Sequence, residues 1–151
     1  MNDELRLVVP DAPSDADRDA IYAELIAFNR THVKPGATGS LAVLLKDQDG
    51  STVGGLWGSA LFEWLRIKLL FVPERWRRSA VGSAILQEAE ALAASRGCIG
   101  ASLDTYSFQA RGFYEKQGYS LVGTISDCPP GGARYFLQKR FDSPALERRE
   151  Q

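Results

Sequence analysis

The chain has 151 residues, of which 44% are hydrophobic and 25% are charged, so it is long enough for one soluble domain with a substantial core. Its formal net charge at pH 7 is −1, which excludes the global positive field of a nucleic-acid coat protein. The two cysteines, Cys98 and Cys128, are far apart, and this spacing argues against a disulfide framework or a thiolate zinc site. Without a long apolar run or a signal-peptide pattern, the sequence predicts a cytoplasmic protein with no membrane contact.

The first third of the chain shows a strand pattern followed by a helix pattern. Leu5, Leu7 and Val9 alternate with other residues, and this period of two predicts a first strand. Residues 17–33 carry apolar side chains at helical spacing, which predicts an amphipathic helix. Its start has two candidate capping residues just before it, at positions 14 and 15.

The middle of the chain predicts a group of strands. Residues 41–46 have the composition of a strand and are followed by a turn. Residues 52–72 are apolar and strand-like but too long for one strand, so they predict two antiparallel strands that turn near residues 63–66.

The last half alternates helices and strands. Residues 80–96 carry an apolar stripe at helical spacing and are followed by Gly97, which is typical of a helix end. The remaining expected elements are a strand over 99–106, a short helix over 108–117, and strands over 119–125 and 134–141. This alternation predicts an α/β domain over residues 1–141, followed by a charged tail over residues 142–151.

The segment that joins the second half to the strands before it has the features of a phosphate-binding site. An apolar strand stops at Val72, a loop with several arginines follows, and a helix opens on small residues. The first amides of a helix are unpaired and carry partial positive charge, so small residues there let a pyrophosphate approach them. The alternative is a solvated basic helix start without a ligand.

This segment resembles the acyl-CoA signature Gln/Arg-x-x-Gly-x-Gly/Ala of the GNAT family of N-acetyltransferases, with Ala80 in place of the first glycine. Alanine is sterically allowed at a helix start, and its amide stays available. The resemblance implies that acetyl-CoA is the co-substrate and that no metal is involved. It assigns the following residues to acetyl-CoA binding: Arg77, Arg78, Ser79, Ala80, Val81, Gly82 and Ser83.

A second segment, residues 107–119, is similar to the family's Asn-x-x-Ala-x-x-Phe-Tyr signature, with Ser107 in the asparagine position. The resemblance implies that Ser107 contributes to cofactor binding and that Tyr114 is the general acid beside the CoA sulfur. A phenol suits this role because its ordinary pKa near 10 keeps it protonated at neutral pH. Read without the family, Tyr114 is an aromatic residue on the core face of a short helix.

The family also predicts the fold and the position of the pantetheine arm. We expect a single-domain GNAT-like fold, with helices flanking a mixed, mostly antiparallel sheet of six or seven strands whose central strands splay at the acyl-CoA site. The main chain of Leu70 and Val72 is then expected to pair with pantetheine as an additional strand.

The residue that takes the proton from the amine is left open. The strand before residues 77–83, which we call the phosphate cradle, carries Arg66 and Lys68, which are unsuited to act as a base. Glu63 and Asp104 are the candidate carboxylates, and His32 is the only histidine. A turn carboxylate, an ion-paired carboxylate and a surface histidine are the respective structural alternatives.

The expected activity is acetyl transfer from acetyl-CoA to a primary amine, on a small molecule or a peptide, by direct attack in a ternary complex. Neither cysteine falls in the two signatures, so no covalent enzyme intermediate is indicated. The alternative function is a non-catalytic module that senses acyl-CoA. Nucleic-acid binding through the short basic loop is disfavoured by the net charge, and a homodimer is common among similar enzymes.

Overall fold

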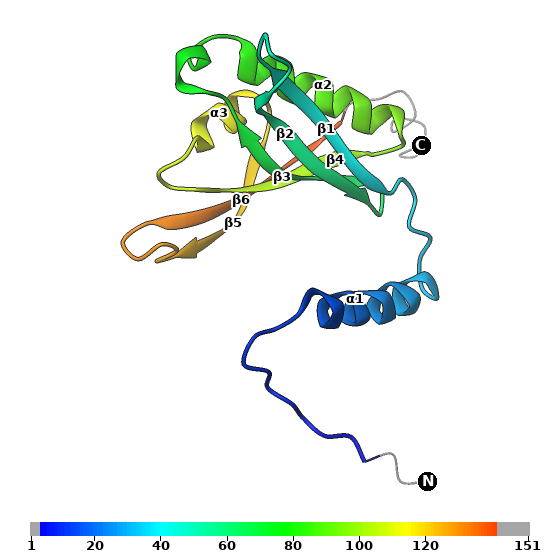
Figure 1. The fold of residues 1–151 in the computed structure, drawn as a ribbon. Helices are drawn as coiled ribbons and strands as arrows, with labels where there is room; N and C mark the ends of the chain where they lie inside the picture. Colours follow the sequence, from blue (N-terminus) through cyan, green and yellow to red (C-terminus); the bar gives the residue numbers. More distant parts are fainter. Residues whose placement is uncertain (1–3, 142–151) are drawn as a thin grey trace. The chain divides into compact units, whose positions relative to one another are not determined.

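The structure is a computed structural model and describes residues 4–141. By its internal contacts the chain divides into two units, one ending at Lys34 and the other beginning at Pro35. Figure 1 shows the ribbon of both. Within the described part of the chain, no helix has the length and apolar character needed to cross a membrane.

The unit that ends at Lys34 contains one helix, α1 (Asp15–Arg30). Ser14 caps it, as the sequence allowed, because its side chain accepts a hydrogen bond from the Asp17 amide. The strand expected at Leu5, Leu7 and Val9 is not formed. An alternating pattern becomes a strand only when a neighbouring strand completes its hydrogen bonds, and residues 4–10 have none.

The unit that begins at Pro35 is built on a six-stranded sheet with the order β1-β2-β3-β4-β6-β5. Only β3 and β4 are parallel; every other neighbouring pair is antiparallel, which confirms the predicted mixed, mostly antiparallel sheet. The strands are β1 (Gly39–Lys46), β2 (Thr52–Leu61), β3 (Trp64–Phe71), β4 (Gly100–Tyr106), β5 (Ser120–Ser126) and β6 (Ala133–Arg140).

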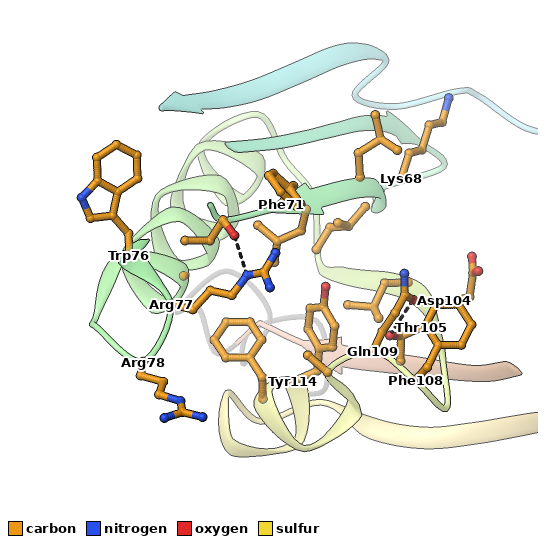
Figure 2. A pocket seen from close by; sticks show the side chains of 18 of the residues that line it. Lys68, Phe71, Trp76, Arg77, Arg78, Asp104, Thr105, Phe108, Gln109 and Tyr114 are labelled. Carbon is orange, nitrogen blue, oxygen red and sulfur yellow. Dashed lines mark hydrogen bonds between the residues drawn. The ribbon is translucent and has the colours of Figure 1, made fainter. Parts of the chain in front are cut away.

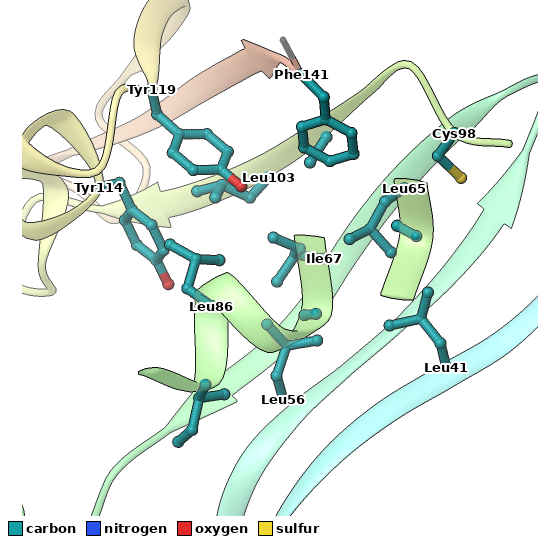
Figure 3. Packing of buried hydrophobic residues seen from close by; sticks show 14 of the residues in the cluster. Leu41, Leu56, Leu65, Ile67, Leu86, Cys98, Leu103, Tyr114, Tyr119 and Phe141 are labelled. Carbon is teal, nitrogen blue, oxygen red and sulfur yellow. The ribbon is translucent and has the colours of Figure 1, made fainter. Parts of the chain in front are cut away.

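The helices of this unit are α2 (Val81–Ser95) and the short α3 (Arg111–Lys116), with a single 3-10 turn, η1 (Glu74–Trp76), before α2. Helix α2 contacts β1 to β4 and buries the face predicted from its periodicity, including Ile85 and Ala89. Together with sheet residues such as Leu56 and Leu65 these side chains form the core, part of which Figure 3 shows.

The hairpin between β2 and β3 turns at Phe62 and Glu63, slightly earlier than expected. Both residues have positive φ, 52° and 64°, which is the geometry of a tight two-residue hairpin turn. Further along, Trp57 pairs with Leu69 while Gly58 pairs with Ile67, so Lys68 is an extra residue in a β-bulge.

The parallel pairing of β3 with β4 is short, and this shapes the site. It joins Trp64, Leu65 and Arg66 to Gly100, Ala101 and Ser102, and no pairs follow. Gly100 is required at its position because an added Cβ would lie 2.6 Å from both the Lys139 carbonyl oxygen and the Trp64 ring. Beyond Arg66 the two central strands separate and leave an opening between them.

Candidate active site

A cleft of about 690 Å³ occupies the opening between β3 and β4. That volume lies in the usual range for small-ligand sites. Its walls are the second half of β3, the loop before α2, the end of β4 and the start of α3 (Figure 2). Both regions singled out in the sequence, the basic loop and the segment around Tyr114, therefore line one cleft.

The basic loop is folded back onto the end of β3. Arg77 donates from Nε to the Val72 carbonyl oxygen at 2.8 Å, and its guanidinium lies 5.4 Å from the centre of the Phe71 ring. The Ser79 hydroxyl donates to the Trp76 carbonyl oxygen. Arg78 has a positive φ of 65°, which turns the chain sharply between this loop and α2.

Among the first amides of α2, that of Val81 donates to the Ser79 hydroxyl at 3.4 Å, whereas those of Gly82 and Ser83 have no partner within the helix. The first backbone bond of the helix runs from the Ala84 amide to the Ala80 carbonyl, so the amides of residues 81–83 precede the helical ladder. Gly82 lines the cleft, and a Cβ there would meet the Phe113 ring at 3.3 Å. A small residue at this position keeps the cradle open, which fits the pyrophosphate of acetyl-CoA.

Not every residue assigned to the cradle faces the cleft. Arg77, Arg78, Ser79 and Gly82 line it. Three others do not: Val81 packs against the core, the Ser83 hydroxyl accepts a hydrogen bond from Gln117, and Ala80 precedes the helix. Any contribution of these three to binding comes through their backbone.

One edge of β3 is open beside the cleft. Strand β2 pairs with β3 up to Phe71 on one side, whereas β4 pairs with it only up to Arg66 on the other. The backbone around Leu70 therefore borders the cleft without a partner strand, as pairing with pantetheine would require. The Val72 carbonyl already accepts from Arg77, but a carbonyl oxygen has a second lone pair for a ligand.

Tyr114 lies in α3 and is 9% exposed. The ring packs edge-on against Phe113 and Tyr119, with ring centres 5.2 Å and 6.0 Å apart. Figure 2 shows its hydroxyl pointing into the cleft, and that hydroxyl makes no hydrogen bond with another described residue. Burial, and secondly the charge of Asp104, raise the pKa of Tyr114 to about 12, so the phenol keeps its proton across the physiological range.

Ser107, expected to bind the cofactor, has another role in the fold. Its hydroxyl accepts a hydrogen bond from the Ala133 amide at 3.1 Å, which ties the end of β4 to the start of β6, and it is not among the residues lining the cleft. Gln109, which the sequence did not single out, lies in the cleft wall instead. Its side-chain oxygen accepts from the Tyr106 amide and the Thr105 hydroxyl, and this bonding orders the turn before α3.

The structure separates the two candidate carboxylates. Asp104 lines the cleft, and its Oδ2 accepts a hydrogen bond from Arg134 Nε at 2.9 Å. Glu63 sits in the β2–β3 turn, beside the paired end of β3, and does not line the cleft. His32 belongs to the unit that ends at Lys34, where its ring lies 4.7 Å from Phe28. Of the two carboxylates, Asp104 is the one that lines the cleft.

Comparison with known proteins agrees with this geometry. The model of the acetyltransferase (GNAT) family matches residues 5–119. The chain is 32% identical over 137 residues to the acetyltransferase Atu2258 of Agrobacterium fabrum, covering 91% of this chain and 100% of that protein. It is 42% identical over 93 residues to the blasticidin-S acetyltransferase of Streptomyces morookaense, covering 61% of this chain and 68% of that protein.

A solved structure extends the likeness to the fold. The crystal structure of an acetyltransferase from Agrobacterium tumefaciens is 32% identical in sequence and superposes with a TM-score of 0.85. It covers 91% of this chain and 100% of that one. This likeness covers nearly the whole chain, and the matching relatives are acetyltransferases rather than sensor modules. The chain therefore belongs to the GNAT family of acetyltransferases.

Proposed function

We propose that this acetyltransferase transfers the acetyl group of acetyl-CoA to a primary amine by direct attack of the amine on the thioester. The observation that carries the proposal is the position of Tyr114, whose hydroxyl points into the cleft near the free edge of β3. In Figure 2 the basic loop and Asp104 lie on opposite sides of this residue. We place the nucleotide on the side of Arg77 and Arg78, and the acceptor on the side of Asp104.

The reaction balances without a covalent enzyme intermediate. The lone pair of the neutral amine forms a bond to the acetyl carbon, and the carbon–sulfur bond of the tetrahedral intermediate then breaks. The amine nitrogen loses a proton to Asp104, which returns it to solvent, and the thiolate of CoA leaves. An alkylammonium acceptor first releases one proton to become the neutral amine. The overall products are then the amide, the thiol form of CoA and one proton.

Tyr114 is proposed to stabilise the leaving thiolate by hydrogen bonding. Its pKa of about 12 lies above the ordinary thiol pKa near 8.5, so complete transfer of its proton is uphill by about 5 kcal/mol. A hydrogen bond that strengthens as charge develops on sulfur avoids that cost.

The experiment that tests this proposal follows the release of free thiol when the purified chain is mixed with acetyl-CoA and a panel of amines. The similarity to a blasticidin-S acetyltransferase supports a small-molecule acceptor, so the panel begins with small amines. We expect amine-dependent thiol release with formation of the acetylated amine, detected by mass spectrometry. Thiol release that does not depend on any amine, or acetylation of the protein in its place, would contradict the proposal.

A further inference from the structure

Lys68 and Asp104 occupy matching places on the two strands that separate. Arg66 and Ser102 are the last paired residues of β3 and β4, and Lys68 and Asp104 each follow two positions later. Side chains two apart on a strand share one face of the sheet. Asp104 therefore lies on the face opposite the buried Leu103, and Lys68, which is exposed, lines the same cleft from β3, so the two residues flank the opening.

The bulge in β3 falls on Lys68 itself. It is the residue without a counterpart in β2, and such an extra residue changes the direction of its side chain and breaks the regular pairing. Lys68 is exposed and lines the cleft. Three residues separate it from Val72, where the phosphate-binding loop begins, so it lies toward the acceptor side.

Asp104 on β4 and Lys68 on β3 differ in whether their charges have a partner. Asp104 accepts a hydrogen bond from Arg134 through Oδ2, which leaves its other carboxylate oxygen for the amine. The Lys68 side chain forms no ion pair or hydrogen bond with any other residue that the structure describes. The acceptor side of the cleft thus holds the positive charge of Lys68 close to the carboxylate that is proposed to take the proton from the amine.

We propose that the acceptor is an amine that also carries an anionic group, with its nitrogen at Asp104 and its anion at Lys68. This inference rests on the proposed function and names the substrate class for it. A neutral or purely cationic amine contacts only Asp104, whereas a molecule with both an amine and an anionic group contacts Asp104 and Lys68. Lys68 is then a specificity-determining residue, because it favours one class of acceptor over another.

The test uses matched pairs of acceptors: ω-amino carboxylic acids from β-alanine to 6-aminohexanoic acid, each with its own carboxamide. The range of lengths covers different separations between the amine and the anion. For each pair the measured quantity is the ratio of kcat/KM for the acid to kcat/KM for the amide. Comparing this ratio between proteins cancels the intrinsic reactivity of each amine.

We expect the unaltered protein to prefer at least one acid over its amide by about tenfold, the effect of one well-formed charge contact. The substitution Lys68→Met should bring that ratio close to one, and Lys68→Glu should reverse it. Lys46→Met, at the end of β1 and outside the cleft, is the matched control and should keep the ratio of the unaltered protein. The KM for acetyl-CoA should stay within about twofold in the Lys68 variants, which excludes an effect on the phosphates.

The results of this test distinguish a failure of the inference about Lys68 from a failure of the proposed function. If the amides are acetylated as well as the acids at every length, or if Lys68→Met leaves the ratio unchanged, the inference is wrong while the proposed function stands. If neither acids nor amides release thiol although other amines of the panel do, the inference is wrong; if no amine of the panel releases thiol, the proposed function itself fails.

Discussion

The Gln117 side chain donates a hydrogen bond from Nε2 to the hydroxyl oxygen of Ser83 at 2.9 Å. Ser83 lies in the first turn of α2, and Gln117 follows the last residue of α3. This bond therefore connects the proposed phosphate cradle with the helix that carries Tyr114, and Phe113 packs beside Gly82 at the same junction.

The first prediction concerns this connection. Ser83→Ala and Gln117→Ala should each lower the free energy of unfolding by about 1 kcal/mol, the usual net contribution of such a hydrogen bond. Urea unfolding of both single variants and of the double variant measures their coupling. We expect the double variant to lose about 1 kcal/mol less than the two single losses added together. Strictly additive losses would show that the bond contributes nothing in solution.

Replacing the Tyr114 hydroxyl should affect turnover more than binding. Tyr114→Phe removes the proposed donor to the thiolate, and we expect kcat to fall by about 100-fold while the Kd of acetyl-CoA changes less than twofold. Steady-state kinetics and titration calorimetry measure the two quantities. Tyr22→Phe, on an exposed tyrosine of α1, is the matched control. Unchanged turnover in Tyr114→Phe would exclude its hydroxyl from the mechanism.

The tyrosines also predict how stability changes in alkali. Burial raises the pKa of Tyr114 to about 12, and burial with the neighbouring Glu90 carboxylate raises the pKa of Tyr119 further. A phenol whose folded-state pKa exceeds its unfolded value near 10 stabilises the fold fully below pH 10, and this contribution is lost as pH rises toward the folded pKa. The free energy of unfolding should therefore fall between pH 10 and 11.5.

This alkaline loss is checked by urea unfolding across that pH range for the unaltered chain and for Tyr119→Phe. The variant lacks one of the two phenols, so its stability should fall less steeply, by up to about 1.4 kcal/mol per pH unit. Because Tyr119 also donates to Glu90 at 3.0 Å, the variant starts from a lower stability. Only the slope is diagnostic, and equal slopes would count against the raised pKa of Tyr119.

Two glycines offer a matched test of the cradle. Gly82 and Gly112 are both the second residue of their helices, but an added Cβ meets the Phe113 ring at 3.3 Å at Gly82 and nothing within 4 Å at Gly112. We expect Gly82→Ala to raise the KM of acetyl-CoA by about fivefold, since crowding beside the cradle shifts its amides. Gly112→Ala should leave this KM unchanged and stabilise the fold by about 0.5 kcal/mol. Equal KM values in both variants would contradict the placement of the nucleotide.

The sequence predicted best those elements that are determined by residues close together in the chain. The apolar stripe of α2 follows from a period of 3.6 residues, and Ile85 and Ala89 are indeed buried. The turn at Phe62 and Glu63 was placed slightly late, because it lacks the Asn-Gly or Asp-Gly signal that marks a tight hairpin. The strand expected at Leu5, Leu7 and Val9 shows that alternation alone does not supply a pairing partner.

The parts of the site that depend on pairing between distant segments could not be predicted from local sequence patterns. The bulge at Lys68 and the end of β3–β4 pairing at Arg66 are set by contacts between distant segments. For the same reason sequence spacing left Glu63 and Asp104 equivalent, although only Asp104 lines the cleft. The family signature led to Tyr114 but also to Ser107, whose hydroxyl here bonds the Ala133 amide.

The most direct test of the central claim is a crystal structure of the chain with CoA bound. We expect the pyrophosphate on the amides of Gly82 and Ser83, the pantetheine arm along the free edge of β3, and the CoA sulfur within about 3.5 Å of the Tyr114 hydroxyl. A nucleotide bound outside the opening between β3 and β4, or a sulfur remote from Tyr114, would contradict the account.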